Sequence, residues 1–109
     1  LKDTITVDDS NPVRIETIQR IVAMKYSVDV KDLKGHKRTS SISMPRQVAM
    51  YLCCEMTDQS STDIGRAFGG KDHSTVLHAR KKISKKVEED LFFLELINKL
   101  QADIKTAER

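Results

Sequence analysis

IGRAFGGKDHSTVLHARKKI, residues 64–83, is the stretch that decides the fold of this chain. A short helical pattern ends at Gly69 and Gly70, and a second helix starts at Asp72 with a polar first turn. Two helices joined by a glycine turn, with small hydrogen-bonding side chains opening the second helix, are typical of a helix-turn-helix that reads base edges in a major groove. The pattern predicts this motif over residues 60–87.

The composition around this stretch favours one small helical domain. A chain of 109 residues with 39% hydrophobic residues can bury one modest core. Aromatic residues make up 5% and Trp is absent, which suits a helical domain better than a β-sandwich or a base-stacking sheet. We expect an all-α fold: a compact helical domain with a Trp-repressor-like helix-turn-helix and a C-terminal helix.

Basic charge gathers around the glycine turn. Residues 34–86 hold 11 Lys and Arg against 4 Asp and Glu, whereas the rest of the chain holds 8 against 12. This asymmetry favours a polyanionic partner on one side of the domain. The acidic remainder argues against a protein that binds nucleic acid over its whole surface.

Helical periodicity outside the motif predicts the remaining elements. Asn11 and Pro12 provide a cap and a start for one helix, and Ser43 and Pro45 do so for another. The expected elements are a linker from an upstream domain over residues 1–11, a helix over 12–27, a helical turn over 30–33, an exposed arm over 36–43, a helix over 44–57 and a last helix ending near 107. Residues 12–109 then form one helix-turn-helix DNA-binding domain.

The second helix of the motif and the last helix each have an apolar face. In the motif helix the inward residues are Val76, Ala79, Ile83 and Val87, and the outward residues are Ser74, His78, Lys81 and Lys85. In the last helix the seam is Phe93, Ile97, Leu100 and Ile104. Leu91, Phe92 and Leu96 lie off that seam, and we expect a corner packed between two neighbouring elements rather than a dimer interface.

The sequence does not support an enzyme. Residues 65–72 read G-x-x-x-x-G-K-D, but a P-loop needs a preceding strand and a hydroxyl where Asp72 stands. Asp72, His73 and Ser74 diverge around the helix and cannot form a catalytic relay. His73 and His78 miss the i,i+4 spacing of a helical metal pair. We expect no catalytic site, no metal and no cofactor in this chain.

The cysteines and the chain ends suggest where the protein works. Cys53 and Cys54 are adjacent, which excludes the spacing of a metal knuckle, and we read them as reduced thiols. No apolar run approaches the roughly 20 residues of a membrane span, and no signal-peptide pattern is visible. These features predict a cytoplasmic protein, and Leu1 in place of Met predicts a fragment of a longer one.

The first turn at Asp72 supplies the candidate base contacts. Asp72 can accept from a cytosine or adenine amino group, His73 and Ser74 can donate or accept, and the Thr75 methyl can pack on thymine. Two local alternatives stay open. Asp72 is also a favoured N-cap, and Thr75 can bond its own backbone.

Basic and polar residues nearby are candidates for holding the DNA backbone. They are Lys37, Arg46, Gln47, Lys71, His78 and Lys82. Arg38, in the arm, can enter an adjacent minor groove, where Arg is attracted to narrow A·T-rich stretches. The alternatives are a disordered basic loop for the arm and a solvated face for the lysines, while Arg80, turned toward the packed side, is expected to lie along the protein.

These residues resemble the C-terminal DNA-binding domain of the bacterial replication initiator DnaA. The resemblance runs from about residue 12 to 87, is densest over residues 64–83, and extends to Lys37-Arg38 and Pro45-Arg46-Gln47. It implies binding of short duplex boxes repeated at the origin, on the bacterial nucleoid. It also implies that Asp72, His73, Ser74 and Thr75 read the major groove, that Arg38 reads the minor groove, and that the remaining candidates hold the backbone or neighbouring bases.

The resemblance implies partners as well. Double-stranded origin DNA is the ligand, and the same protein carries an ATP-binding ATPase domain upstream, while the fragment itself is expected to be monomeric. One alternative is a helix-turn-helix transcriptional repressor, a dimer on a palindromic operator. Another is a helical protein-interaction or membrane-surface module with weak contact to acidic membranes, based on the amphipathic first helix and the apolar start of the last.

Overall fold

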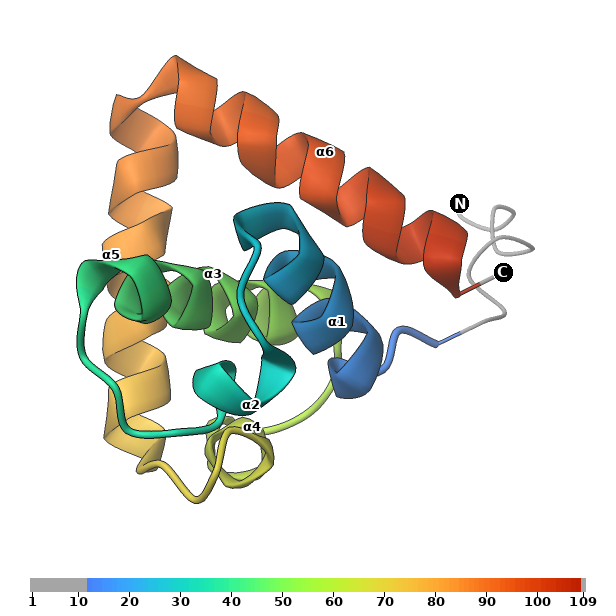
Figure 1. Ribbon diagram of the computed structural model, residues 1–109. Helices are drawn as coiled ribbons and strands as arrows, with labels where there is room; N and C mark the ends of the chain where they lie inside the picture. Colours follow the sequence, from blue (N-terminus) through green and yellow to red (C-terminus); the bar gives the residue numbers. More distant parts are fainter. Residues whose placement is uncertain (1–11, 109) are drawn as a thin grey trace.

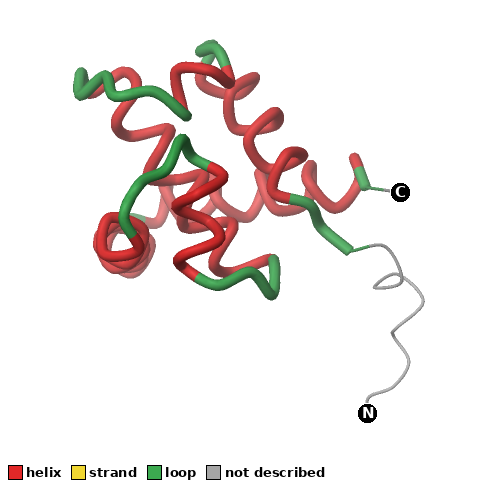
Figure 2. Tube along the Cα trace, turned by 90° about the horizontal axis from the view of Figure 1, so that it is seen from below, coloured by secondary structure: helices red, strands yellow, loops and turns green. Residues whose placement is uncertain are grey.

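Helices account for all regular secondary structure of residues 12–108, the part of the chain that the computed structural model describes (Figures 1 and 2). In chain order they are α1 (Ile15–Tyr26), α2 (Val30–Leu33), α3 (Ser40–Met56), α4 (Ser61–Ala67), α5 (His73–Glu89) and α6 (Leu91–Ala107). The all-α prediction is confirmed. The linker expected over residues 1–11 lies outside the described residues.

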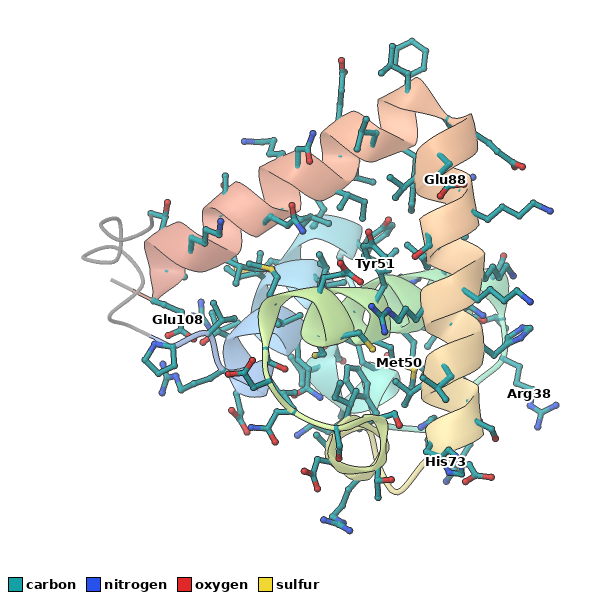
Figure 3. All side chains as sticks on the ribbon, turned by 180° about the vertical axis from the view of Figure 1, so that it is seen from behind. Arg38, Met50, Tyr51, His73, Glu88 and Glu108 are labelled. Atoms are coloured by element: carbon teal, nitrogen blue, oxygen red, sulfur yellow. The ribbon has the colours of Figure 1, made fainter. Side chains whose placement is uncertain are left out.

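Helix α3 is the centre of the domain. It packs against α1, α2, α4 and α5, and all residues from 48 to 53 are buried. Figure 3 shows two of them, Met50 and Tyr51, inside the body of the protein beside α5. This middle part of α3 has no polar face because it is surrounded by other helices. Burial of each large aliphatic side chain there contributes about 1.5–3 kcal/mol to stability.

Helices α5 and α6 meet at a corner and α6 then runs back across α1 (Figure 1). Asp90 makes the corner, since its carboxylate accepts from the Phe93 N–H at 3.2 Å and so caps α6. The far end of α6 is tied to the start of α1, where the Arg14 N–H donates to Glu108 at 2.7 Å. The expected seam of Phe93, Ile97, Leu100 and Ile104 is buried as predicted.

Two helix starts differ from the prediction. Arg14, rather than Asn11, occupies the N-cap position of α1, so Pro12 precedes the helix. Helix α3 begins at Ser40, which shortens the exposed arm expected over 36–43 and places Pro45 inside the helix. Ile42, an apolar residue within the polar stretch before Pro45, is buried in the first turn of α3.

The packed corner predicted at the start of α6 is wrong for two of its residues. Leu91 is 67% exposed and Phe92 is 83% exposed, because they fall on the outer side of the bend that Asp90 makes. Leu96 is half-buried and packs against the core. The helix therefore carries two apolar side chains in water at its first turn.

Candidate nucleic-acid interface

The turn between α4 and α5 is built on glycine. Gly69 and Gly70 have φ angles of +86° and +79°, in the left-handed region that side chains disfavour. Gly65, inside α4, lies so close to the Lys71 carbonyl that a Cβ there would collide with it, and its own carbonyl accepts from the Lys71 N–H at 2.8 Å. The chain therefore folds tightly back on α4 before α5 starts.

Capping fixes the first helix of the motif. The Asp63 N–H donates to the Ser60 hydroxyl at 3.1 Å, which gives α4 a side-chain cap at its N-terminus. Ile64 and Phe68 are buried, and they hold α4 against the core. The buried residues of α4 and the glycine turn that follows it together fix how α4 and α5 are oriented.

Helix α5 has one buried and one exposed side, as its periodicity predicts. Val76, Ala79 and Ile83 are buried, whereas the outward residues expected from the sequence are exposed. The helix carries an exposed polar and basic strip, namely Ser74, His78, Lys81, Lys82 and Lys85. Leu77, on the same helix, is also 46% exposed.

The first turn of α5 lies at the surface. Asp72, His73, Ser74 and Thr75 are all exposed, and Figure 3 shows His73 at the free end of the helix. Side-chain exposure is 72% for Asp72 and 58% for His73. Four neighbouring hydrogen-bonding side chains at one helix end are available to an external partner.

The Asp72 carboxylate does not cap α5. Asp72 holds the N-cap position with extended backbone, but its side chain accepts from no backbone N–H of the helix. It contacts the Ser74 hydroxyl at 3.3 Å and Nδ1 of His73 at 3.4 Å instead. The structure therefore does not show the side-chain cap that the sequence offers as an alternative role for Asp72.

The loop between α2 and α3 carries the predicted arm residues at the surface. Lys37 and Arg38 are exposed, and Figure 3 shows Arg38 pointing away from the body beside α5. Lys37 forms an ion pair of 3.5 Å with Asp32, which at 65% exposure of the lysine is weak. Gln47, in α3, is half-buried.

Arg46 requires a correction. The sequence placed it on a DNA phosphate, but its side chain is buried and directed into the protein. Its guanidinium donates to the carbonyls of Leu33 at 2.9 Å, Lys37 at 2.7 Å and Asp32 at 2.7 Å. Burial lowers the pKa of Arg46. Its role is to hold the end of α2 and the loop that follows.

Lys71 requires a similar correction. Its ammonium donates to the carbonyls of Gly35 at 2.5 Å, Phe68 at 2.7 Å and Lys34 at 3.2 Å. An ammonium has three N–H donors, so these bonds occupy all of them and leave none for a phosphate. Burial lowers the pKa of Lys71, and the charge of Arg46 lowers it further.

Comparison with protein families agrees with this geometry. The family model described as bacterial DnaA protein helix-turn-helix matches residues 15–83, more than half of the chain. The chain belongs to this family. Membership implies DNA binding in replication initiation, through a helix-turn-helix that is a binding module.

The DnaA family match includes most of the exposed strip but not Lys85. It covers α1 to α4 and the first part of α5, up to Ile83, and therefore includes the whole exposed first turn. Helix α6 lies beyond it. In this DnaA-family domain α6 contributes buried side chains to the core from outside the matched residues.

No helix among residues 12–108 is long and apolar enough to cross a membrane. The same residues contain no group of three or more His, Cys, Asp or Glu side chains suited to a metal ion. Cys53 and Cys54 are free thiols, and burial raises the pKa of each.

Arg80 lies at the surface next to α3. Its Nε and Nη2 atoms each lie 3.2 Å from the Glu55 carboxylate. The residue therefore spans from α5 to α3 along the protein, in the direction expected from the sequence. The basic residues of α5 that remain directed into solvent are Lys81, Lys82 and Lys85.

Proposed function

We propose that this chain binds short boxes of double-stranded DNA at a replication origin, as one monomeric module on each asymmetric site. The observation that carries the proposal is the exposed first turn of α5, residues 72–75, on a helix whose other side is buried. A helix that packs on the core with one side can insert its exposed N-terminal turn into a major groove about 12 Å wide.

Each side chain of that turn has a base-reading role. The Asp72 carboxylate, free of a capping bond, accepts from the amino group of cytosine or adenine. His73 and Ser74 donate or accept, and the Thr75 methyl packs against thymine. Ser74 offers a hydroxyl but no methyl, so its contact is polar only.

Contacts to the DNA backbone surround the base contacts. The side chains of His78 and Lys82 lie on the exposed strip of α5, and Lys37 and Gln47 belong to the loop and the helix next to it. The helix N-terminus adds a partial positive charge that attracts phosphate. Arg38 reaches the adjacent minor groove.

ATP-dependent assembly belongs to another part of the protein in this proposal. An ATPase domain upstream of this module would form the initiator complex, and the module would recognise the origin sequence on the nucleoid DNA. The family match supports the DNA-binding part of this division, because the matched region is a helix-turn-helix.

Selection of bound duplexes from a random pool, at stated salt, tests the proposal. We expect one short asymmetric box to be enriched, and sedimentation to find one protein on each box. A palindromic box carrying two proteins would indicate a dimeric repressor instead. No enrichment, or vesicle binding that survives competition by the selected duplex, would contradict origin recognition.

A further inference from the structure

We propose that Lys71 is a positioning residue that fixes the Arg38 loop against the α4–α5 turn, so that the two grooves of the DNA are read at one set spacing. The proposal rests on the proposed function and deepens it, because it assigns part of the specificity to a residue that touches no base. The loop concerned is residues 34–39, between α2 and α3.

Three carbonyls from two separate helix ends converge on the Lys71 ammonium. Those of Lys34 and Gly35 follow α2, and that of Phe68 follows α4. The last carbonyls of a helix lack intrahelical partners and carry its partial negative charge, so a cation between two such ends stabilises both. One side chain therefore joins the loop to the turn.

Gly69 brings the same two segments into backbone contact. A Cβ at Gly69 would collide with the Lys34 carbonyl, and the φ of +86° already requires glycine there. The turn and the loop are therefore packed on each other over Gly69 and joined by Lys71 next to it. Gly69 and Lys71 immediately precede the first turn of α5 in the chain.

Arg46 holds the other side of the loop. Its donors reach the carbonyls of Asp32 and Leu33 before the loop, and that of Lys37 within it. Lys37 is the residue before Arg38. The backbone that leads to Arg38 is thus held by two cations, the buried Arg46 and the half-buried Lys71, while the Arg38 side chain is exposed.

This bracing has a consequence for recognition. With Lys71 in place, a side chain in the minor groove and the first turn of α5 in the major groove belong to one rigid unit. Without the Lys71 side chain, ordering of the loop on DNA binding costs free energy, and Arg38 therefore contributes less to the affinity. The base contacts of α5 do not depend on the loop and should persist.

The experiment measures affinity for the selected duplex with either an A·T-rich or a G·C-rich flank, at several salt concentrations. The proteins are the wild type and the variants Lys71→Met, Arg38→Ala, the double variant and Lys82→Met. Wild type is expected to prefer the A·T-rich flank about tenfold through Arg38. Lys71→Met should reduce that preference towards the Arg38→Ala value, with an unchanged salt slope.

Coupling separates positioning from simple charge. Lys71→Met and Arg38→Ala together should cost little more than Arg38→Ala alone. The control Lys82→Met should weaken both flanks alike, lower the salt slope by nearly one and add fully to Arg38→Ala. Lys71→Arg keeps a cationic donor, so it should retain most of the flank preference.

Two results would overturn the proposal. One is a Lys71→Met protein that keeps the flank preference and loses one unit of salt slope, which would make Lys71 a phosphate contact. The other is full additivity with Arg38→Ala. If circular dichroism shows that Lys71→Met is unfolded, Lys71→Gln, which keeps an amide donor, replaces it. A wild type with no preference for the selected duplex over a scrambled one would instead refute the proposed function.

Discussion

Arg46 and Lys71, 25 positions apart in the chain, donate to carbonyls of the same short segment: Arg46 Nη1 to Lys37 at 2.7 Å, and Lys71 Nζ to Gly35 at 2.5 Å. Two cations this close disfavour each other, which adds to burial in lowering the pKa of Lys71. The carbonyls between them offset that repulsion. The loop carrying Arg38 is therefore held by ion–dipole contacts rather than by an apolar core.

Replacing Arg46 with Met should destabilise the fold by about 2–4 kcal/mol, because three carbonyls lose a charged donor and part of the core is disturbed. Urea unfolding followed by circular dichroism measures the change. Lys81→Met, on the exposed strip, is the matched control and should change stability by less than about 0.5 kcal/mol. An Arg46→Met protein of normal stability would refute this structural role.

Gly69→Ala should cost more stability than Gly70→Ala. Both positions have positive φ, so each alanine pays about 1–2 kcal/mol of backbone strain. Only at Gly69 would the new Cβ also meet a backbone atom, the Lys34 carbonyl, since nothing lies within 4 Å at Gly70. Thermal unfolding of the pair gives the comparison, and equal losses would mean that the turn and the loop are not in firm contact.

His73→Ala should remove discrimination at one or two base pairs. The expected loss is about 1–3 kcal/mol on the selected duplex and little on random DNA, because a base contact is worth nothing where the base is wrong. Competition binding with single-base variants of the duplex measures it. A loss of the same size on random DNA would place His73 on the backbone.

Lys82→Ala should weaken binding to every sequence alike. A phosphate contact releases about one counterion, so the slope of log affinity against log salt should fall by roughly 0.9. Salt titrations on the selected and a scrambled duplex provide the measurement. A loss confined to the selected duplex would assign Lys82 to base reading.

Much of the fold was predictable because it depends on local signals. Ser60 capped α4, the glycine pair ended it, and the spacing of Val76 and Ile83 divided α5 into a buried and an exposed side. Each of these signals is a rule about near neighbours in the chain. The family match over residues 15–83 agrees with them.

The remaining features depend on contacts that leave no local pattern. The sequence predicts phosphate contacts for Arg46 and Lys71, because nothing in a sequence shows that a cation will turn inward to backbone carbonyls. The start of α3 has no clear local signal, because the buried Ile42 stands among polar residues. The exposure of Phe92 follows from the angle of the bend at Asp90, which periodicity does not specify.

The division of α5 between an inner and an outer side has a further consequence. Val76, Ala79 and Ile83 are responsible for folding, and the positions from 73 to 75 make no contribution to the core. Under the proposed function, substitutions at these exposed positions should alter the preferred DNA sequence and leave the buried side of α5 unchanged. The domain should therefore tolerate changes of DNA specificity, because the residues that would contact bases are not the ones that pack in the core.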